Sequence, residues 1–201
     1  MDKSLYLDHL NLLPIPGEAF FYPGFFTEAE SDQYFQELTH QVTWKQEPIK
    51  VFGKDILQPR FTAFYGDEAT SYSYSGITLN AMPWIDTLTR IKENIETKFD
   101  VEFNTCLLNH YRSGADSIGW HRDNEKNLGQ YPFIASVSFG APRIFQFRHY
   151  TDKIPIISVE LTHGSLLIMK ADTQHLWEHR LPKILRPVGP RINLTFRLIL
   201  K

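Results

Sequence analysis

The sequence predicts an α+β fold in which helices come first and a β-sandwich or barrel follows. Two stretches before residue 100 carry apolar residues at helical spacing, and the chain after residue 101 consists of short strand-like runs. Helices followed by many strands are typical of an α+β fold. The 201 residues contain no internal repeat, low-complexity tract or Pro/Gly/Ser-rich linker, so we expect a single domain spanning 1–201.

Both helices have recognisable ends. The first begins at Thr27, where Glu30 three residues later completes a capping box, and it runs to about Val42. The second follows the segment NAMPW and ends near Asp100. The residues expected to face the core are Tyr34, Phe35 and Leu38 in the first helix and Ile85, Leu88, Ile91 and Ile95 in the second.

Turn residues of the Gly, Pro and Asp types separate the strand-like runs. The runs read VEFNTCLLNHY (101–111), FIASVSFG (133–140), RIFQFRHY (143–150), IISVELT (156–162), GSLLIMK (164–170) and RINLTFRLIL (191–200). The single cysteine, Cys106, lies in the first run and has no partner cysteine. We therefore expect a buried, unreactive thiol in a reducing compartment.

The net charge of −2 conceals an asymmetry along the chain. Residues 1–40 carry seven acids and one base, whereas the remainder carries 16 acids and 20 bases. Such a locally basic chain permits an anionic partner without requiring one. The N-terminus lacks a signal-peptide pattern and no apolar run is long enough to span a membrane. These features favour a cytoplasmic protein (nucleoid-associated in a bacterium, nuclear in a eukaryote).

The segment GWHRDNE (119–125) places His121 and Asp123 one residue apart. Residues i and i+2 of an extended segment point to the same side, so both side chains are able to bind one metal ion. A second histidine would complete the 2-His-1-carboxylate triad of non-haem Fe(II) oxygenases. The alternative is a surface loop with an ordinary His–Asp hydrogen bond, and the pair alone does not decide between the two.

Two candidates for the second histidine lie in TQHLWEHRLPK, just before the last strand-like run. His179 is the better candidate because Leu181 and Pro182 follow it as turn residues, but spacing leaves His175 open. His163 precedes a turn glycine, which suits a structural hydrogen bond. The histidines expected elsewhere are His9 and His40 on the surface, His149 at a strand end, and His110 on the strand face opposite Asn109 and Tyr111.

The run RINLTFR alternates strictly between polar and apolar residues. One face carries Arg191, Asn193, Thr195 and Arg197, and the other carries Ile192, Leu194, Phe196 and Leu198. A polar face of this kind is either an exposed edge or the wall of a polar cavity. Because arginine binds carboxylates bidentately, a set that also includes Asn109 and Tyr111 suits a small dicarboxylate beside a metal.

Five ordered motifs resemble those of the AlkB family of Fe(II)- and 2-oxoglutarate-dependent dioxygenases. They are LNHYRSGADSIGWHRDNE, PFIASVSFGAPRIFQFRH, HGSLLIM, HRLPK and PRINLTFR, and the resemblance covers about residues 47–198. It implies a double-stranded β-helix (jelly roll) over 101–201, behind N-terminal helices and a nucleotide-recognition lid within 1–100. It also implies oxidative demethylation of bases such as 1-methyladenine and 3-methylcytosine, with Fe(II), 2-oxoglutarate and O2 consumed and succinate, CO2 and formaldehyde released.

The resemblance implies a role for each matching residue. Iron is expected to bind His121, Asp123 and His179, which favours His179 over His175. Arg191 is expected to pair with the distal carboxylate of 2-oxoglutarate. The other expected contacts to this cosubstrate are Asn109, Tyr111, Asn193, Thr195 and Arg197. The expected contacts to the damaged base and its DNA are Phe52, Arg60, Tyr72, Tyr74 and Glu125.

The stretch from Val51 to Leu79 is most similar to the subgroup that acts on duplex DNA. There, Val51–Phe52–Gly53 matches a hydrophobic finger that enters the base stack, between Lys50 and Lys54. Position 74 is Tyr where duplex-acting relatives often carry Phe, so its hydroxyl bears on which lesions fit. We expect a monomer that accepts duplex and single-stranded DNA. The alternatives are the same chemistry on RNA or protein, or a non-enzymatic cupin-like binding module.

Overall fold

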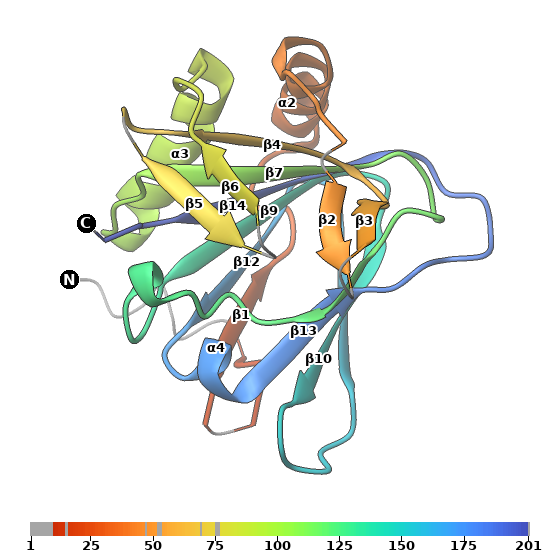
Figure 1. Cartoon of the computed structure of the whole chain (residues 1–201). Coiled ribbons are helices and arrows are strands. Elements are labelled where there is room, and N and C mark those ends of the chain that lie inside the picture. The colour runs from red at the N-terminus through yellow and green to blue at the C-terminus, as the bar shows by residue number, and fades with distance from the viewer. Residues whose placement is uncertain are drawn as a thin grey trace.

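The computed structural model describes residues 10–14, 16–46, 48–51, 54–68, 70–74 and 77–200. At 49–51, 54–55, 71–74 and 77–79 it describes the backbone alone. Two antiparallel sheets form the centre of the molecule (Figure 1). The major sheet has the order β1 (Glu18–Tyr22), β12 (Ser165–Lys170), β9 (Ile134–Gly140), β14 (Arg191–Arg197), β7 (Thr105–Tyr111) and β4 (Phe61–Gly66).

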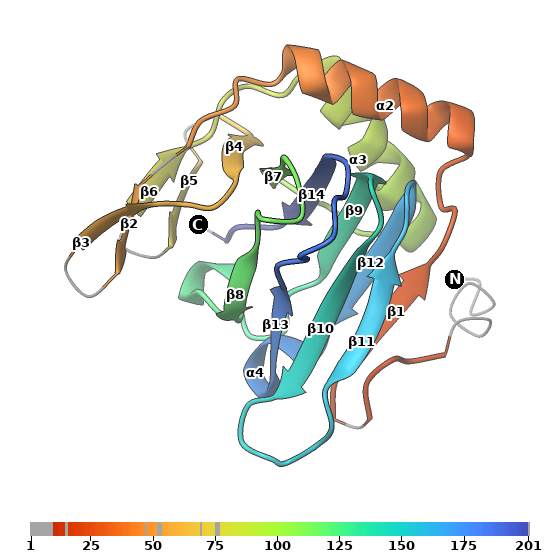
Figure 2. The same cartoon turned by 90° about the vertical axis from the view of Figure 1, so that its right-hand side faces the viewer.

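The minor sheet faces the major one. Its order is β11 (Ile157–Leu161), β10 (Arg143–His149), β13 (Trp177–Leu181) and β8 (Ile118–His121). Figure 2 shows this sheet in front of β14, β9, β12 and β1, with the two long helices along one side. Two hairpins extend at the opposite side, formed by β2 (Pro48–Val51) with β3 (Lys54–Leu57) and by β5 (Ser71–Tyr74) with β6 (Ile77–Asn80). The arrangement confirms the predicted α+β jelly-roll class. The strands of the major sheet are not confined to 101–201, because β1 and β4 come from earlier in the chain and β1 precedes both long helices.

The first long helix, α2 (Glu28–Gln41), begins as the sequence predicts. Glu30 N donates to the Thr27 hydroxyl at 3.3 Å, while Thr27 N donates to a Glu30 carboxylate oxygen at 2.9 Å. Both halves of the capping box are therefore present. Tyr34 and Leu38 are buried, and Phe35 packs against the core while remaining partly exposed.

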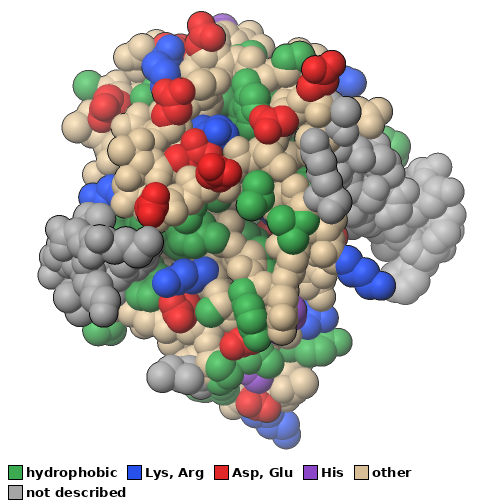
Figure 3. Space-filling view, turned by 90° about the vertical axis from the view of Figure 1, so that its left-hand side faces the viewer, with side chains coloured by type: hydrophobic (Ala, Val, Ile, Leu, Met, Phe, Trp, Pro, Cys, Tyr) green, Lys and Arg blue, Asp and Glu red, His purple; other side chains and the backbone are tan. Residues whose placement is uncertain are grey.

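The second long helix, α3 (Asp86–Phe99), is also confirmed. Leu88, Ile91 and Ile95 are fully buried against the major sheet, because their spacing places them on one helical face. The helix ends where Asp100 adopts a left-handed conformation, with φ of 54°. Figure 3 shows that Asp and Glu side chains gather on the upper part of the face that carries this helix.

Two apolar layers stabilise the fold. One lies between the helices and the major sheet and includes Ile192, Leu194 and Phe196, as their alternation predicts. The other lies between the two sheets and is built around residues such as Phe147 and Trp177. Because one face of β14 belongs to the first layer, its opposite, polar face points toward the space between the sheets.

The structure corrects several strand boundaries. The first predicted run begins as a strand only at Thr105, and the last ends at Arg197. Leu198, which we expected on the apolar face, therefore lies beyond β14 and is 40% exposed. Cys106 is buried and unpaired as expected, and burial raises the pKa of its thiol. No helix in the described part of the chain is long and apolar enough to cross a membrane.

Candidate active site

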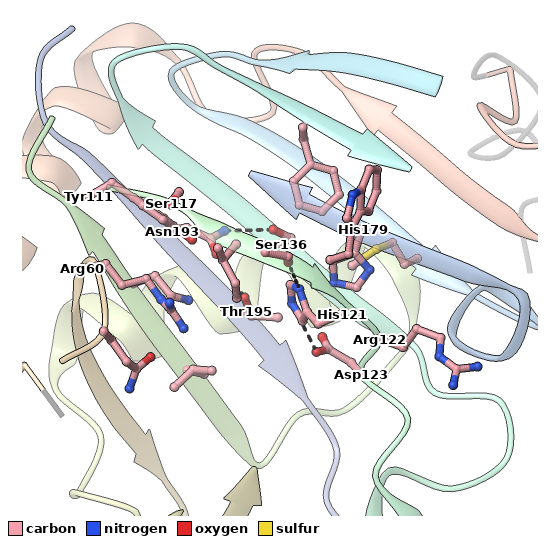
Figure 4. A pocket seen from close by; sticks show the side chains of 18 of the residues that line it. Arg60, Tyr111, Ser117, His121, Arg122, Asp123, Ser136, His179, Asn193 and Thr195 are labelled. Atoms are coloured by element: carbon pink, nitrogen blue, oxygen red, sulfur yellow. Dashed lines mark hydrogen bonds and ion pairs between the residues drawn. The ribbon is translucent and has the colours of Figure 1, made fainter. Parts of the chain in front are cut away.

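A cavity of about 360 Å³ opens between the two sheets. The polar faces of β7 and β14 form one wall, β8 and β13 form another, and the segments before β4 and after β8 complete it. Figure 4 shows the side chains that converge there. The polar and titratable residues that line it are Gln58, Arg60, Asn109, Tyr111, Ser117, Trp120, His121, Arg122, Asp123, Glu125, Ser136, His179, Asn193, Thr195 and Arg197.

His121 and His179 lie directly opposite each other on neighbouring strands. Their Cα atoms are register partners in the pairing of β8 with β13, and their ring centroids are 4.3 Å apart. Asp123 joins them, so that one potential ligand atom from each of the three residues lies within 4.8 Å of the other two. The structure thus brings together the three predicted ligands and places them against the cavity (Figure 4).

Asp123 reaches this position differently from the way we expected. The sequence pattern places His121 and Asp123 on one side of an extended strand, but β8 ends at His121 and Asp123 follows it. Two side chains from other elements form hydrogen bonds with Asp123 there. Arg197 Nη2 donates to Asp123 Oδ2 at 2.6 Å, and the Asp123 backbone N–H donates to Gln174 Oε1 at 2.9 Å.

The electrostatics of the three residues suit a divalent cation. Burial, and next to it the proximity of His121, lowers the pKa of His179 to about 3, so its imidazole is neutral at physiological pH. Burial by itself raises the pKa of the Asp123 carboxyl, but Arg197 and the two histidines outweigh it and hold that pKa well below its usual range. Two neutral imidazoles and one carboxylate are the protonation states that metal binding requires.

His179 has a further property that fits a metal. Its side chain is buried, and its Nδ1 atom has no hydrogen-bond partner within the described residues. The ring is held by Phe145, which stacks on it with centroids 5.3 Å apart. A buried ring nitrogen without a protein partner is unusual, because such groups are nearly always satisfied. The donor set therefore fits a mononuclear iron site of the 2-His-1-carboxylate type.

His175 does not join this group. It lies on the short helix α4 (Thr173–Leu176), is exposed, and its Nε2 contacts the carbonyl oxygen of Gln130. His163 accepts a hydrogen bond from Gly140 N at 2.8 Å, so its expected structural role is confirmed. His110 packs against Trp44 away from the cavity, with ring centroids 5.1 Å apart, as expected. His40 is exposed, and His9 lies outside the described residues.

The predicted polar faces of β7 and β14 meet across the strand pairing. Asn193 is the register partner of Asn109, and Arg191 is that of Tyr111. Asn193 Nδ2 donates to Ser136 Oγ at 2.8 Å, which ties the row to the neighbouring strand β9 (Figure 4). Asn109, Tyr111, Asn193, Thr195 and Arg197 all line the cavity.

Arg191 lies behind this row rather than on the cavity surface itself. It is 2% exposed, its Nη2 donates to Ser138 Oγ at 2.9 Å, and its guanidinium lies 5.3 Å from the Tyr111 ring centroid. Burial lowers its pKa to about 10, which still leaves it charged at physiological pH. Within the described residues it forms no ion pair, and its Nε is without a partner. A buried cation in this condition suits a carboxylate ligand, because buried charges are normally paired.

The residues expected to contact DNA are only partly described. Arg60 is buried, lines the cavity and donates from Nε to Asn109 Oδ1 at 2.6 Å. Glu125 lines the cavity at the start of the 3-10 turn η1 (Lys126–Leu128). Tyr72 and Tyr74 belong to β5, where only the backbone is described. Phe52 and Gly53 lie outside the described residues, so the predicted finger stays a prediction.

Sequence reasoning missed three kinds of residue. Arg143 is almost fully buried and donates to the carbonyl oxygens of Ser113, Asp116 and Pro182, which pins the loops that follow β7 and β13. Gln174 holds the backbone of Asp123. Ser136 and Ser138 bind Asn193 and Arg191. Of these, only the serines could have been found from the sequence, because two polar residues at alternate positions of an otherwise apolar strand lie on the same face.

The fold and the site define a jelly-roll oxygenase with a mononuclear iron centre, and comparison with known proteins agrees. A family model described as the 2OG-Fe(II) oxygenase superfamily matches residues 18–197. The chain is 42% identical over 189 residues to DNA oxidative demethylase ALKBH2 of Homo sapiens, an alignment that covers 89% of this chain and 72% of the relative. It is 42% identical over 188 residues to alpha-ketoglutarate-dependent dioxygenase alkB homolog 3 of Homo sapiens, with 89% and 65% covered.

A solved structure titled "The structure of OsALKBH1" matches with a TM-score of 0.66 at 17% identity, over 92% of this chain and 99% of that one. At this identity the match supports the fold. The chain belongs to the AlkB family within the 2OG-Fe(II) oxygenase superfamily. Its cofactor is accordingly Fe(II), its cosubstrates are 2-oxoglutarate and O2, and His121, Asp123 and His179 form the group that fits the metal.

Proposed function

We propose that this protein repairs alkylated DNA by oxidative removal of N-methyl groups from bases such as 1-methyladenine and 3-methylcytosine. One observation carries the proposal: a group of two histidines and one carboxylate and a row of amide, phenol and guanidinium side chains share one cavity. The relatives named DNA oxidative demethylase, from Homo sapiens, Bos taurus and Mus musculus, are 41–42% identical to this chain and supply the substrate class.

We assign a role in this reaction to each group of residues in and around the cavity. His121, Asp123 and His179 hold Fe(II), and Arg197 keeps Asp123 ionised for that purpose. Arg191 binds one carboxylate of 2-oxoglutarate. Its guanidinium lies against the ring of Tyr111, which lines the cavity together with Asn193. With Fe(II) and 2-oxoglutarate bound, the enzyme would convert 2-oxoglutarate and O2 to succinate and CO2. In the same reaction the methyl group of the base would be hydroxylated and leave as formaldehyde.

Glu125 would recognise the damaged base. Both lesions carry a positive charge and an exocyclic amino group, and a carboxylate at the cavity wall accepts a hydrogen bond and neutralises charge. Such a base lies inside a duplex and must be flipped out before it reaches the cavity, at a cost of a few kcal/mol. We propose that Phe52, which lies between Lys50 and Lys54 in the sequence, fills the space that the flipped base leaves in the duplex. We also propose that the protein acts as a monomer on duplex and single-stranded DNA.

The proposal is tested with purified protein, Fe(II), 2-oxoglutarate and air on DNA that carries 1-methyladenine or 3-methylcytosine. Formaldehyde and succinate are expected in equal amounts, together with the unmodified base, and Asp123→Ala is expected to abolish all three. Succinate without base restoration would refute these bases as substrates, and RNA and methylated peptides are then assayed in turn. Absence of succinate from wild-type protein under every condition would refute the enzymatic function.

The duplex assignment needs a separate comparison. Phe52→Ala is expected to impair repair of a duplex while sparing the same lesion in a single strand, because a single strand leaves no gap to fill. Its melting temperature is measured alongside, since the loss of a core phenylalanine would cost about 3–5 kcal/mol. A large fall in melting temperature with an unchanged ratio of duplex to single-strand activity would rule out the insertion of Phe52 into the base stack. Size-exclusion chromatography with light scattering tests whether the protein is a monomer in solution.

A further inference from the structure

Asp123 is the one member of the metal-binding group that no strand holds in place. His121 and His179 are register partners within the minor sheet, so the backbone pairing of β8 with β13 sets their distance. Asp123 lies two residues beyond the last partner, where that pairing has ended. Something other than the sheet must therefore position its backbone.

The neighbouring helix α4 supplies this support. Asp123 N donates to Gln174 Oε1 at 2.9 Å, and Arg122 Nη1 donates to the His175 carbonyl oxygen at 2.9 Å. Two consecutive residues after β8 are thereby attached to two consecutive residues of α4. Gln174 is 1% exposed, so its side chain lies inside the protein rather than in solvent.

The helix α4 is itself fixed to the major sheet. The Thr173 hydroxyl accepts from Glu18 N at 2.8 Å and lies 2.7 Å from the Lys170 carbonyl oxygen, to which it donates. Glu18 begins β1 and Lys170 ends β12, and these residues are register partners. Gln174 Nε2 points to Met169 Sδ at 3.6 Å, which orients the amide with its oxygen toward Asp123. The position of Gln174 is thus set by the major sheet.

We infer that Gln174 is a positioning residue that holds Asp123 in reach of the metal, acting through the Asp123 backbone. Arg197 Nη2 binds Asp123 Oδ2 at 2.6 Å, and Gln174 holds the backbone of the same residue from another element. Without Gln174, the Asp123 N–H loses its partner and the carboxylate is free to follow Arg197. Groups that orient a metal ligand typically change metal affinity 10- to 100-fold when they are removed.

The inference rests on the proposed ligand roles of His121, Asp123 and His179, and the experiment separates the two. Co(II), whose visible spectrum reports coordination geometry and which does not react with O2 as Fe(II) does, is titrated into the full chain without activity being measured. Wild type is expected to bind one Co(II), and Asp123→Ala is expected to bind it far more weakly. Equal binding by these two proteins would overturn the ligand assignment, not the role of Gln174 alone.

Gln174→Leu is expected to raise the Kd for Co(II) at least about tenfold and to change the visible spectrum of the bound ion. Gln174→Glu keeps an acceptor oxygen at the same reach, so it is expected to restore the wild-type spectrum. Binding and a spectrum like those of wild type in Gln174→Leu would overturn the inference. So would a Gln174→Glu variant as impaired as Gln174→Leu, because packing rather than the acceptor would then matter.

Thr87→Val is the matched control for loss of a buried hydrogen bond. Thr87 is 1% exposed and bonds across the helices to Glu37 and Gln41, and none of these three residues lines the cavity. It is expected to lower the melting temperature without changing Co(II) binding. If Gln174→Leu does not fold, Gln174→Met, with an unbranched side chain of the same length, repeats the comparison under the same expected and contradicting outcomes.

Discussion

Arg197 and Asp123 form a buried ion pair in which Nη2 lies 2.6 Å from Oδ2, with side chains that are 5% and 7% exposed. The pair joins the last residue of β14 in the major sheet to the segment after β8 in the minor sheet. It therefore connects the polar row that we assign to 2-oxoglutarate with the group that fits the metal.

Arg197→Gln should destabilise the metal-free protein by about 3–5 kcal/mol at pH 7, because it leaves the Asp123 carboxylate buried without a counter-charge. Urea unfolding measures the change. Arg148→Gln is the control, since its ion pair with Glu178 is partly exposed and is expected to contribute no more than about 1 kcal/mol. Equal effects of the two substitutions would contradict a special role for the buried pair.

The ion pair between Arg197 and Asp123 also determines how the stability of the protein changes with pH. The folded-state pKa of Asp123 is depressed, so its contribution to stability is present above the unfolded-state pKa, which is near 4, and is lost as the pH falls toward the folded-state value. Wild type is therefore expected to lose this contribution only below about pH 4. In Arg197→Gln the stabilisation by the ion pair should already be missing at pH 7. The difference in free energy of unfolding between wild type and Arg197→Gln should therefore become smaller as the pH falls below about 4.

Arg191→Lys should raise the KM for 2-oxoglutarate well beyond any change in DNA affinity. Lysine keeps the charge but not the planar, bidentate donor pair. Steady-state kinetics with 2-oxoglutarate varied, and binding of lesion DNA measured separately, give the two quantities. Arg143→Lys is the comparison: its guanidinium holds three backbone carbonyls, so we expect mainly a lower melting temperature. An unchanged KM in Arg191→Lys would refute its role.

Glu125→Gln should slow the repair of cationic lesions more than that of a neutral etheno adduct. The carboxylate at the cavity wall favours a positively charged base, and charge-assisted hydrogen bonds are about twice as strong as neutral ones. Single-turnover rates on 1-methyladenine, 3-methylcytosine and the etheno adduct provide the test. Glu160→Gln, on the exposed side of β11, should leave all three rates unchanged. Equal slowing of every lesion by Glu125→Gln would mean that Glu125 does not discriminate by charge.

His179→Ala should abolish Fe(II) binding, whereas His175→Ala should preserve it. The two histidines are four residues apart, but only His179 faces His121 across the strand pairing. Isothermal titration with Fe(II) under anaerobic conditions distinguishes the variants. His175→Ala is expected to disturb only its contacts with Gln130 and Tyr131. Loss of metal binding in His175→Ala and its retention in His179→Ala would reverse the assignment.

The sequence by itself determined the elements that rest on local chemistry. Thr27 and Glu30 cap a helix wherever it lies, because the capping box involves only residues three apart. Strict alternation in RINLTFR placed Ile192 on the apolar face and Asn193 on the polar face, because side chains alternate along any strand. Ordered motifs also identified the family and favoured His179.

Only the tertiary structure decided which distant groups meet. Asp123 owes its position to Arg197 and Gln174, which lie 74 and 51 residues away, and no local pattern encodes contacts at such separations. The same holds for Arg143, whose role depends on three carbonyl oxygens in two loops. The expectation that Asp123 lies on a strand was wrong because strand length is set by cross-strand partners, and β8 has none beyond His121. Sequence thus specified the ligand types, and packing of the two sheets specified their geometry.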